Sequence, residues 1–144
     1  MRVIIDCNIL VSFLTSPGSS LQKIQEAWKK DIFEVLISNE ILEEIEETLR
    51  VVSLQGYFDK QDYMVLLKLL IKKATMVNVT SVTHECVDPD DNRYLNCAKD
   101  GKANYLITGD KHHLLPMRKY KYTKIISPSD FTLILAAYPK KIKN

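Results

Sequence analysis

Residues 88–115, DPDDNRYLNCAKDGKANYLITGDKHHLL, decide the fold that we predict for this chain. Asp88 followed by Pro89 predicts the start of a helix, with Asp88 as its N-cap and Pro89 at the first helical position. Asp91 falls on the same helical face as the apolar residues three, four and seven positions further on. We therefore expect the Asp91 carboxylate to face the core side of the helix, where it needs a positive neighbour.

A short strand follows this helix. Gly101 is predicted to end the helix, residues 103–108 read as the strand, and Gly109 breaks it. Asp110 therefore lies just beyond the carboxyl end of a predicted parallel strand. In open α/β sheets, ligands bind at that edge.

The start of the chain repeats this arrangement. Residues 3–5 are β-branched and apolar, which is typical of a central buried strand, and Asp6 follows them directly. Asp6 therefore lies just beyond the carboxyl end of its predicted strand, as Asp110 does for the later strand. Asn8 is either the N-cap of a helix over residues 9–14 or a polar residue that serves the same edge.

The remaining pattern alternates helices with strands. Helices are predicted over residues 21–30, 40–51 and 59–73 and from Ser127 onward, and strands over residues 33–37, 76–79 and 123–126. This alternation indicates an α/β fold with three layers, α/β/α, around a central parallel sheet. A length of 144 residues suits one domain that spans residues 1–144.

The composition restricts the possible environments and partners. Twenty basic residues against 18 acidic ones give a net charge of +2, so only local patches could indicate nucleic-acid binding. Three cysteines without a CxxC motif suggest a reducing compartment, and no apolar run reaches membrane-spanning length. We expect a cytoplasmic protein that does not enter a membrane.

Four glutamates lie on the helix predicted over residues 40–51. Glu43 and Glu47 point away from its apolar face, whereas Glu44 and Glu46 flank that face on opposite sides. Periodicity alone does not choose between Glu44 and Glu46.

Asp6, Asp91 and Asp110 come from distant parts of the chain but face the same predicted edge. Several carboxylates gathered there repel one another unless protons or cations neutralise them. Mg²⁺ and Mn²⁺ are hard ions that take few carboxylates and keep several waters. The three acids therefore predict a site for Mg²⁺ or Mn²⁺ that could activate a water against a phosphodiester.

Four segments together carry a resemblance to a known family. They are VIIDCN at residues 3–8, ILEEI at residues 41–45, DPDDN at residues 88–92 and LITGD at residues 106–110. In their order and spacing, over nearly the whole chain, the sequence resembles the PIN-domain ribonucleases. The resemblance is to the small prokaryotic branch assigned as toxins of toxin–antitoxin pairs.

The resemblance implies a sheet of about five parallel strands, a site for Mg²⁺ or Mn²⁺, and hydrolysis of RNA. It also implies an antitoxin protein as a partner and a homodimer. Carried over by position, the catalytic and metal-binding acids are Asp6, Glu44, Asp91 and Asp110. Asn8 and Thr108 match supporting polar positions. Asp88 matches a further acid, with its role as an N-cap as the alternative.

Basic residues interleaved with tyrosines follow Asp110. They could hold an RNA backbone or form a solvated loop. The candidates for RNA binding are Lys111, His112, His113, Arg118, Lys119 and Lys121. His112 and His113 could also shuttle protons, although surface histidines commonly have no such role.

Two other functions compete with a ribonuclease. One is a binding module that resembles the family but lacks activity. The other is a phosphatase of the haloacid dehalogenase type, because Asp6 follows a strand and Asp110 follows Thr-Gly. That family normally has a second aspartate where Asn8 stands, which counts against the phosphatase.

Overall fold

The computed structural model describes residues 1–15 and 18–138, and its centre is a sheet with the strand order β3-β2-β1-β4-β6-β5. The strands are β1 (Arg2–Ile5), β2 (Glu34–Ile37), β3 (Thr75–Met76), β4 (Tyr105–Ile107), β5 (Lys119–Tyr120) and β6 (Thr123–Ile126). All neighbours pair in parallel except β5, which is antiparallel to β6. The predicted parallel sheet is confirmed, and the two-residue strand β5 adds a sixth strand to it.

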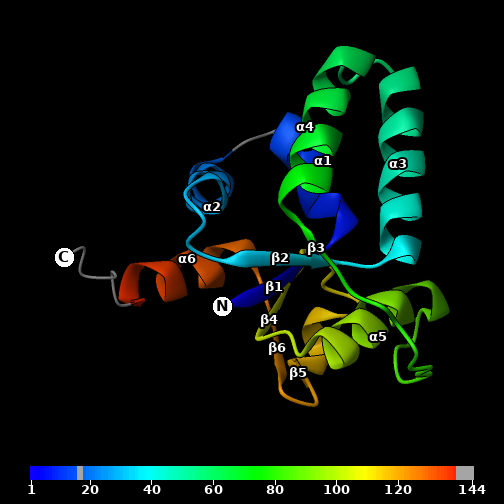
Figure 1. The fold of residues 1–144 in the computed structure, drawn as a ribbon, viewed down its shortest axis with the longest axis vertical. Helices are drawn as coiled ribbons and strands as arrows, with labels where there is room; N and C mark the ends of the chain where they lie inside the picture. Colours follow the sequence, from blue (N-terminus) through cyan, green and yellow to red (C-terminus); the bar gives the residue numbers. More distant parts are fainter. Residues whose placement is uncertain (16–17, 139–144) are drawn as a thin grey trace.

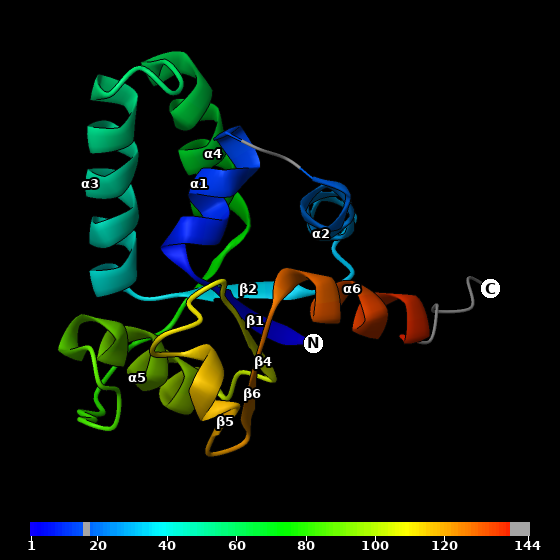
Figure 2. The same ribbon diagram turned by 180° about the vertical axis from the view of Figure 1, so that it is seen from behind.

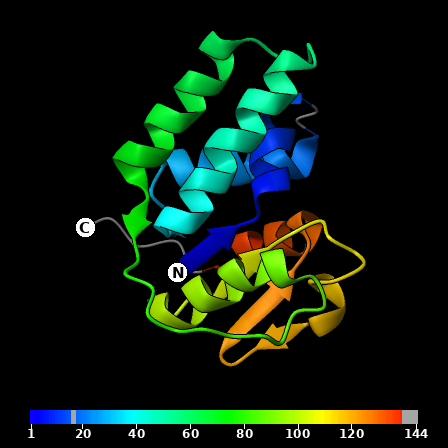
Figure 3. The ribbon, with the colours of Figure 1, turned by 90° about the vertical axis from the view of Figure 1, so that its right-hand side faces the viewer.

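Helices cover both faces of this sheet (Figures 1 and 3). The helix α5 (Asn92–Gly101) packs on one face, and the other helices lie on the opposite face, where α2, seen end-on, crosses next to α6 (Figure 2). These are α1 (Cys7–Thr15), α2 (Ser19–Lys29), α3 (Asn39–Leu54), α4 (Lys60–Lys73) and α6 (Pro128–Ala137). Two short 3₁₀ helices are η1 (Pro89–Asp91) and η2 (Leu115–Met117). None of the described helices is both long and apolar enough to cross a membrane.

The core lies between the sheet and its two helical layers. Val3 and Ile4 of β1 and Leu106 of β4 are fully buried, because these central strands are covered on both faces. Phe131 of α6 packs edge-on against Phe33, with the ring centroids 5.2 Å apart. This packing anchors the last helix to the sheet.

The start of α1 differs from the prediction. The backbone N–H groups of Ile9 and Leu10 donate to the carbonyl of Asp6, so the helix begins at Cys7 and Asn8 is its second residue. The prediction of Asn8 as an N-cap is therefore wrong. Its exposed side chain remains at the carboxyl edge of the sheet.

The end of α5 also differs in detail. Gly101 is the last residue of the helix, and Lys102 takes the left-handed conformation with φ of 53°. A Cβ atom on Gly101 would lie 2.8 Å from Leu36 Cδ1 and 2.9 Å from Val77 Cγ2. Glycine is thus required here by the close packing of α5 on β2, and not by a left-handed turn.

This topology gathers distant residues at one edge. Ile5 of β1 pairs in register with Ile107 of β4, so the residues that follow both strands emerge together. The chain returns through α5 before it enters β4, so the helix starts at the same edge. The ends of β1 and β4 and the start of α5 therefore meet.

Candidate metal centre

A polar pocket of about 400 Å³ opens at this edge of the sheet. Its lining includes all four predicted acids, Asp6, Glu44, Asp91 and Asp110, and also Asn8, Asp88 and His113. Glu46 is exposed elsewhere on α3, so Glu44 is the glutamate that faces the pocket. A larger groove of about 1270 Å³ between α2 and α6 has none of the four acids among its described lining residues.

Asp6 lies at the floor of the pocket, where only 5% of the residue is exposed. The hydroxyl of Thr108 donates to Asp6 Oδ2 at 2.7 Å and accepts from the backbone N–H of Asp110 at 3.0 Å. Burial raises the pKa of Asp6, although the hydrogen bond from Thr108 opposes that rise. Thr108 thus joins the acids that follow β1 and β4, as its predicted supporting position implies.

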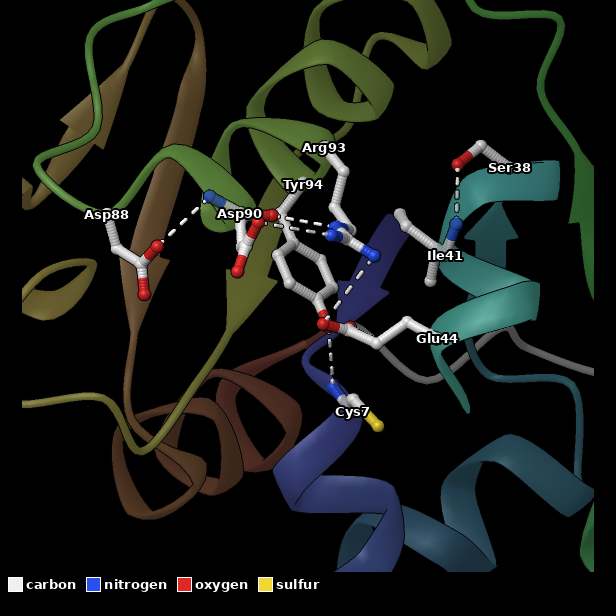
Figure 4. Close-up of polar contacts among 8 residues, drawn as sticks. All are labelled: Cys7, Ser38, Ile41, Glu44, Asp88, Asp90, Arg93 and Tyr94. Carbon is white, nitrogen blue, oxygen red and sulfur yellow. Dashed lines mark hydrogen bonds and ion pairs between the residues drawn. The ribbon is translucent and has the colours of Figure 1, made fainter. Parts of the chain in front are cut away.

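Glu44 reaches the pocket from the second turn of α3 (Figure 4). The Tyr94 hydroxyl donates to Glu44 Oε1 and accepts from the backbone N–H of Cys7. Burial raises the pKa of Glu44, and the hydrogen bond from Tyr94 and the charge of Arg93 oppose that rise. Tyr94 therefore fixes Glu44 relative to the start of α1.

Arg93 lies beside the pocket residue Glu44, and sequence reasoning missed it. Its Nη1 lies 3.7 Å from Glu44 Oε2, and its Nε donates to the carbonyl of Asp90 at 2.7 Å (Figure 4). Only 19% of the side chain is exposed. The sequence predicts a positive neighbour for Asp91, but the positive side chain of Arg93 pairs with Glu44 instead. No sequence pattern signals this contact, because α3 and α5 meet only in the folded chain.

Asp91 lies at the end of η1, and of the four acids it is the one whose pKa is shifted strongly. Burial and the negative charges of Asp6, Asp88 and Asp110 raise the pKa of Asp91 to about 7. The pocket thus has more negative charge than its own residues neutralise near neutral pH. Its oxygen donors fit a hard divalent cation, which would remove this repulsion.

Asp110 is held by the loop that it begins. Its Oδ1 accepts from the backbone N–H groups of His112 and His113 at 3.0 and 3.1 Å, and its Oδ2 accepts from that of Leu114 at 3.3 Å. Burial alone would raise the pKa of Asp110, but these three donors hold it below its usual value. Asp110 is therefore fixed in place as a charged group.

Asp88 caps η1 and also faces the pocket. Its Oδ1 accepts from the backbone N–H of Asp90 at 3.0 Å, which confirms it as the N-cap of η1. It also lines the pocket. One ligand atom each of Asp88, Asp91 and His113 lie within 4.8 Å of one another. The sequence did not predict His113 as part of such a group.

The structure divides the predicted basic strip. Lys111, His112 and His113 follow Asp110 directly and lie beside the pocket. Lys119 instead pairs with Lys124 near the amino end of β6, and Lys121 lies in the turn between β5 and β6. Because β6 runs parallel to β4, that end of β6 lies away from the acids. The lysines of the β5–β6 hairpin therefore do not adjoin the pocket.

Comparison with known proteins places the chain in a family. The PIN domain matches residues 2–112, and the chain belongs to the PIN-domain family. An uncharacterized protein of Methanocaldococcus jannaschii is 31% identical over 130 residues, which cover 87% of this chain and 81% of that protein.

Two solved structures share the fold. VapBC2 from Rickettsia felis, bound to a DNA fragment from its promoter, aligns with a TM-score of 0.59 and 12% identity over 88% of this chain and 98% of that chain. PAE2754 from Pyrobaculum aerophilum aligns with a TM-score of 0.61 and 17% identity over 96% of this chain and 91% of that chain. These likenesses confirm the predicted three-layer α/β/α architecture.

Proposed function

We propose that this protein is a metal-dependent endoribonuclease that hydrolyses phosphodiester bonds of RNA. The observation that carries the proposal is the convergence of Asp6, Glu44, Asp91 and Asp110 in one pocket at the carboxyl edge of the sheet. Proteins of the PIN-domain family are generally nucleases, and the chain belongs to that family. This arrangement of carboxylates favours attack on a phosphate group by a water molecule over attack by a nucleophilic side chain of the protein.

The donor set favours Mg²⁺ or Mn²⁺. All four proposed ligands, Asp6, Glu44, Asp91 and Asp110, offer carboxylate oxygens, which hard cations prefer. Such an ion, when bound, supplies a more acidic water and offsets negative charge on the phosphodiester. The repulsion that raises the pKa of Asp91 to about 7 supports a cation in this pocket.

The chain's own residues hold the reacting groups in position. Thr108 orients Asp6, and Tyr94 with Arg93 orients Glu44, so both carboxylates are fixed before any substrate arrives. In the hydrolysis, a water oxygen bonds to phosphorus, the bond from phosphorus to one ester oxygen breaks, and the water's proton is transferred to that oxygen. Lys111 and His112, beside the pocket, would hold the neighbouring phosphates.

The biological setting is part of the same proposal. The fold shared with VapBC2 of Rickettsia felis supports a toxin of a toxin–antitoxin pair, with an antitoxin protein as partner. The homodimer and the cytoplasmic location stay predictions from the sequence. Co-expression of the chain with the product of a neighbouring gene, followed by co-purification, tests for an antitoxin. Light scattering of the pure protein measures the oligomeric state.

Cleavage of RNA by the pure protein tests the proposed activity. We expect cleavage with Mn²⁺ or Mg²⁺, none with EDTA, and none for Asp6→Asn. Glu44→Gln should lose cleavage, whereas Glu46→Gln on the same helix should keep it. Cleavage that resists EDTA, or that is unchanged in Asp6→Asn, contradicts the proposal. Metal binding without cleavage would indicate a binding module, and rapid turnover of a small phosphate ester would indicate a phosphatase.

A further inference from the structure

The carboxylate of Asp110 is held in place by the loop that follows it. Its two oxygens accept three backbone N–H groups, from His112, His113 and Leu114. The His113 Nδ1 atom lies 3.4 Å from Asp110 Oδ2. The loop thus fixes both oxygens of Asp110 at the pocket, and Oδ2 also faces the imidazole of His113.

This contact orients the His113 ring. A proton on Nδ1, directed toward the Asp110 carboxylate, leaves the lone pair of the imidazole on the other ring nitrogen. Histidines that bind metals commonly pair their second nitrogen with a carboxylate in this way, because the pair fixes both the tautomer and the ring orientation. His113 therefore has the support that a ligand needs.

Two carboxylates lie near His113 and could bind the same cation with it. One ligand atom each of His113, Asp88 and Asp91 lie within 4.8 Å of one another, and all three residues are half-buried. Asp88 is held in place by its hydrogen bond from the backbone N–H of Asp90. The group comes from two separate segments, η1 with its cap and the loop after β4. The backbone of these two segments therefore positions the three side chains whether or not an ion is bound.

We propose that Asp88, Asp91 and His113 form a cation position at the mouth of the pocket, with Asp110 as a positioning residue for His113. The imidazole nitrogen makes this position prefer a transition-metal ion such as Mn²⁺ over Mg²⁺. Imidazole is a good ligand for transition metals, whereas Mg²⁺ is bound almost entirely by oxygen. The inference concerns the pocket of the proposed ribonuclease and deepens that proposal by naming a determinant of metal selectivity.

Pulsed electron paramagnetic resonance on the full chain with one equivalent of Mn²⁺ tests this position directly. A directly coordinated ¹⁴N nucleus modulates the electron spin echo of Mn²⁺. We expect this modulation in the wild type, its loss in His113→Gln and its retention in His112→Gln, the adjacent exposed histidine. The proposal is overturned if the wild type lacks nitrogen modulation, or if the modulation persists in His113→Gln.

Calorimetric titration with Mn²⁺ and with Mg²⁺ separates selectivity from structural damage. His113→Gln should weaken Mn²⁺ binding by about 10-fold or more and change Mg²⁺ binding much less. Asp110→Asn should weaken the binding of both ions, because Asp110 is itself a proposed ligand, and should weaken Mn²⁺ binding more than Mg²⁺ binding. A parallel loss of both affinities in His113→Gln would mean only a structural role for His113, and it overturns the proposal. Thermal unfolding in EDTA checks that each variant folds.

These outcomes are distinguishable from the failure of the proposed function. If the protein shows nitrogen modulation but does not cleave RNA, the ribonuclease proposal fails and the cation position stands. If it cleaves RNA with Mn²⁺ but shows no nitrogen modulation, the activity stands and His113 is only a charge partner of Asp110.

Discussion

The hydroxyl of Tyr94 joins Glu44 on α3 to the first peptide group of α1. It donates to Glu44 Oε1 and accepts from the backbone N–H of Cys7 at 3.2 Å. Burial and the charges of Asp6 and Glu44 raise the pKa of Tyr94 above its usual value, so the hydroxyl keeps its proton and remains a donor. One buried phenol thus positions a carboxylate on α3 relative to the acid that follows β1.

Replacement of Tyr94 by phenylalanine tests this relationship. The ring is 1% exposed and its packing is retained, but Glu44 and the Cys7 N–H each lose a partner. We expect a fall of about 1–3 kcal/mol in the free energy of unfolding and Mn²⁺ binding about 10-fold weaker. Urea unfolding and calorimetric titration measure the two effects.

Tyr105→Phe is the matched control for Tyr94→Phe. Tyr105 is partly buried and packs its ring against the core, 5.8 Å from that of Phe131, but it lies at the start of β4, away from the acids. Removal of the Tyr105 hydroxyl should leave the Mn²⁺ affinity unchanged. Equal Mn²⁺ affinities in the wild type and Tyr94→Phe would contradict a positioning role for Tyr94.

The raised pKa of Asp91 predicts how stability depends on pH without metal. Because the folded pKa is about 7 and the unfolded value is near 3.8, the folded state binds the proton more tightly. Ionisation of Asp91 therefore lowers stability progressively as the pH rises from about 4 to about 7. Asp91→Asn removes this loss, so in EDTA its melting temperature should exceed that of the wild type at pH 8, with a difference that shrinks toward pH 5.

Asp90→Asn serves as the control for Asp91→Asn, since the Asp90 side chain is 81% exposed. It should show no such pH-dependent gain in melting temperature. Addition of Mn²⁺ at pH 8 should reverse the order, because the ion stabilises the wild type more than Asp91→Asn. A gain in Asp91→Asn that is the same at every pH would argue against repulsion among the acids.

The close contact at Gly101 predicts an effect on the fold alone. A Cβ atom there would lie 2.8 Å from Leu36 and 2.9 Å from Val77, so Gly101→Ala forces α5 away from β2. We expect a loss of about 1–3 kcal/mol in the free energy of unfolding, although alanine normally stabilises a helix. Gly18→Ala, with no atom within 4 Å of the added Cβ, should have little effect. Chemical denaturation of both variants decides the matter.

Several parts of the fold and site were predictable because local physics determines them. The apolar runs of β1 and β4 gave the positions of Asp6 and Asp110, since parallel strands end at a common edge. The Asp88–Pro89 pair gave the start of η1. These features depend on residues adjacent in the sequence, and the structure confirms them.

The remaining features depend on contacts between distant segments. Periodicity could not choose between Glu44 and Glu46, because that choice depends on the position of α5 relative to α3. Arg93 and His113 acquire their partners only when their elements meet. The sequence predicts one basic strip after Asp110, but the reversal of the chain at β5 places Lys119 and Lys121 at the other end of β6.

The divided basic strip leads to a prediction for RNA binding. Lys111 adjoins the pocket, whereas Lys121 lies in the β5–β6 turn, away from the acids. If RNA is held beside the pocket, Lys111→Ala should weaken RNA binding. It should also reduce the slope of log affinity against log salt concentration by about one. Lys121→Ala removes the same charge from another surface and should leave both quantities close to wild type. We would measure these affinities by fluorescence anisotropy with single-stranded RNA, Asp6→Asn protein and a series of salt concentrations. Equal effects of the two substitutions would mean that RNA extends over both ends of the sheet, and a loss only in Lys121→Ala would move the binding surface to the hairpin.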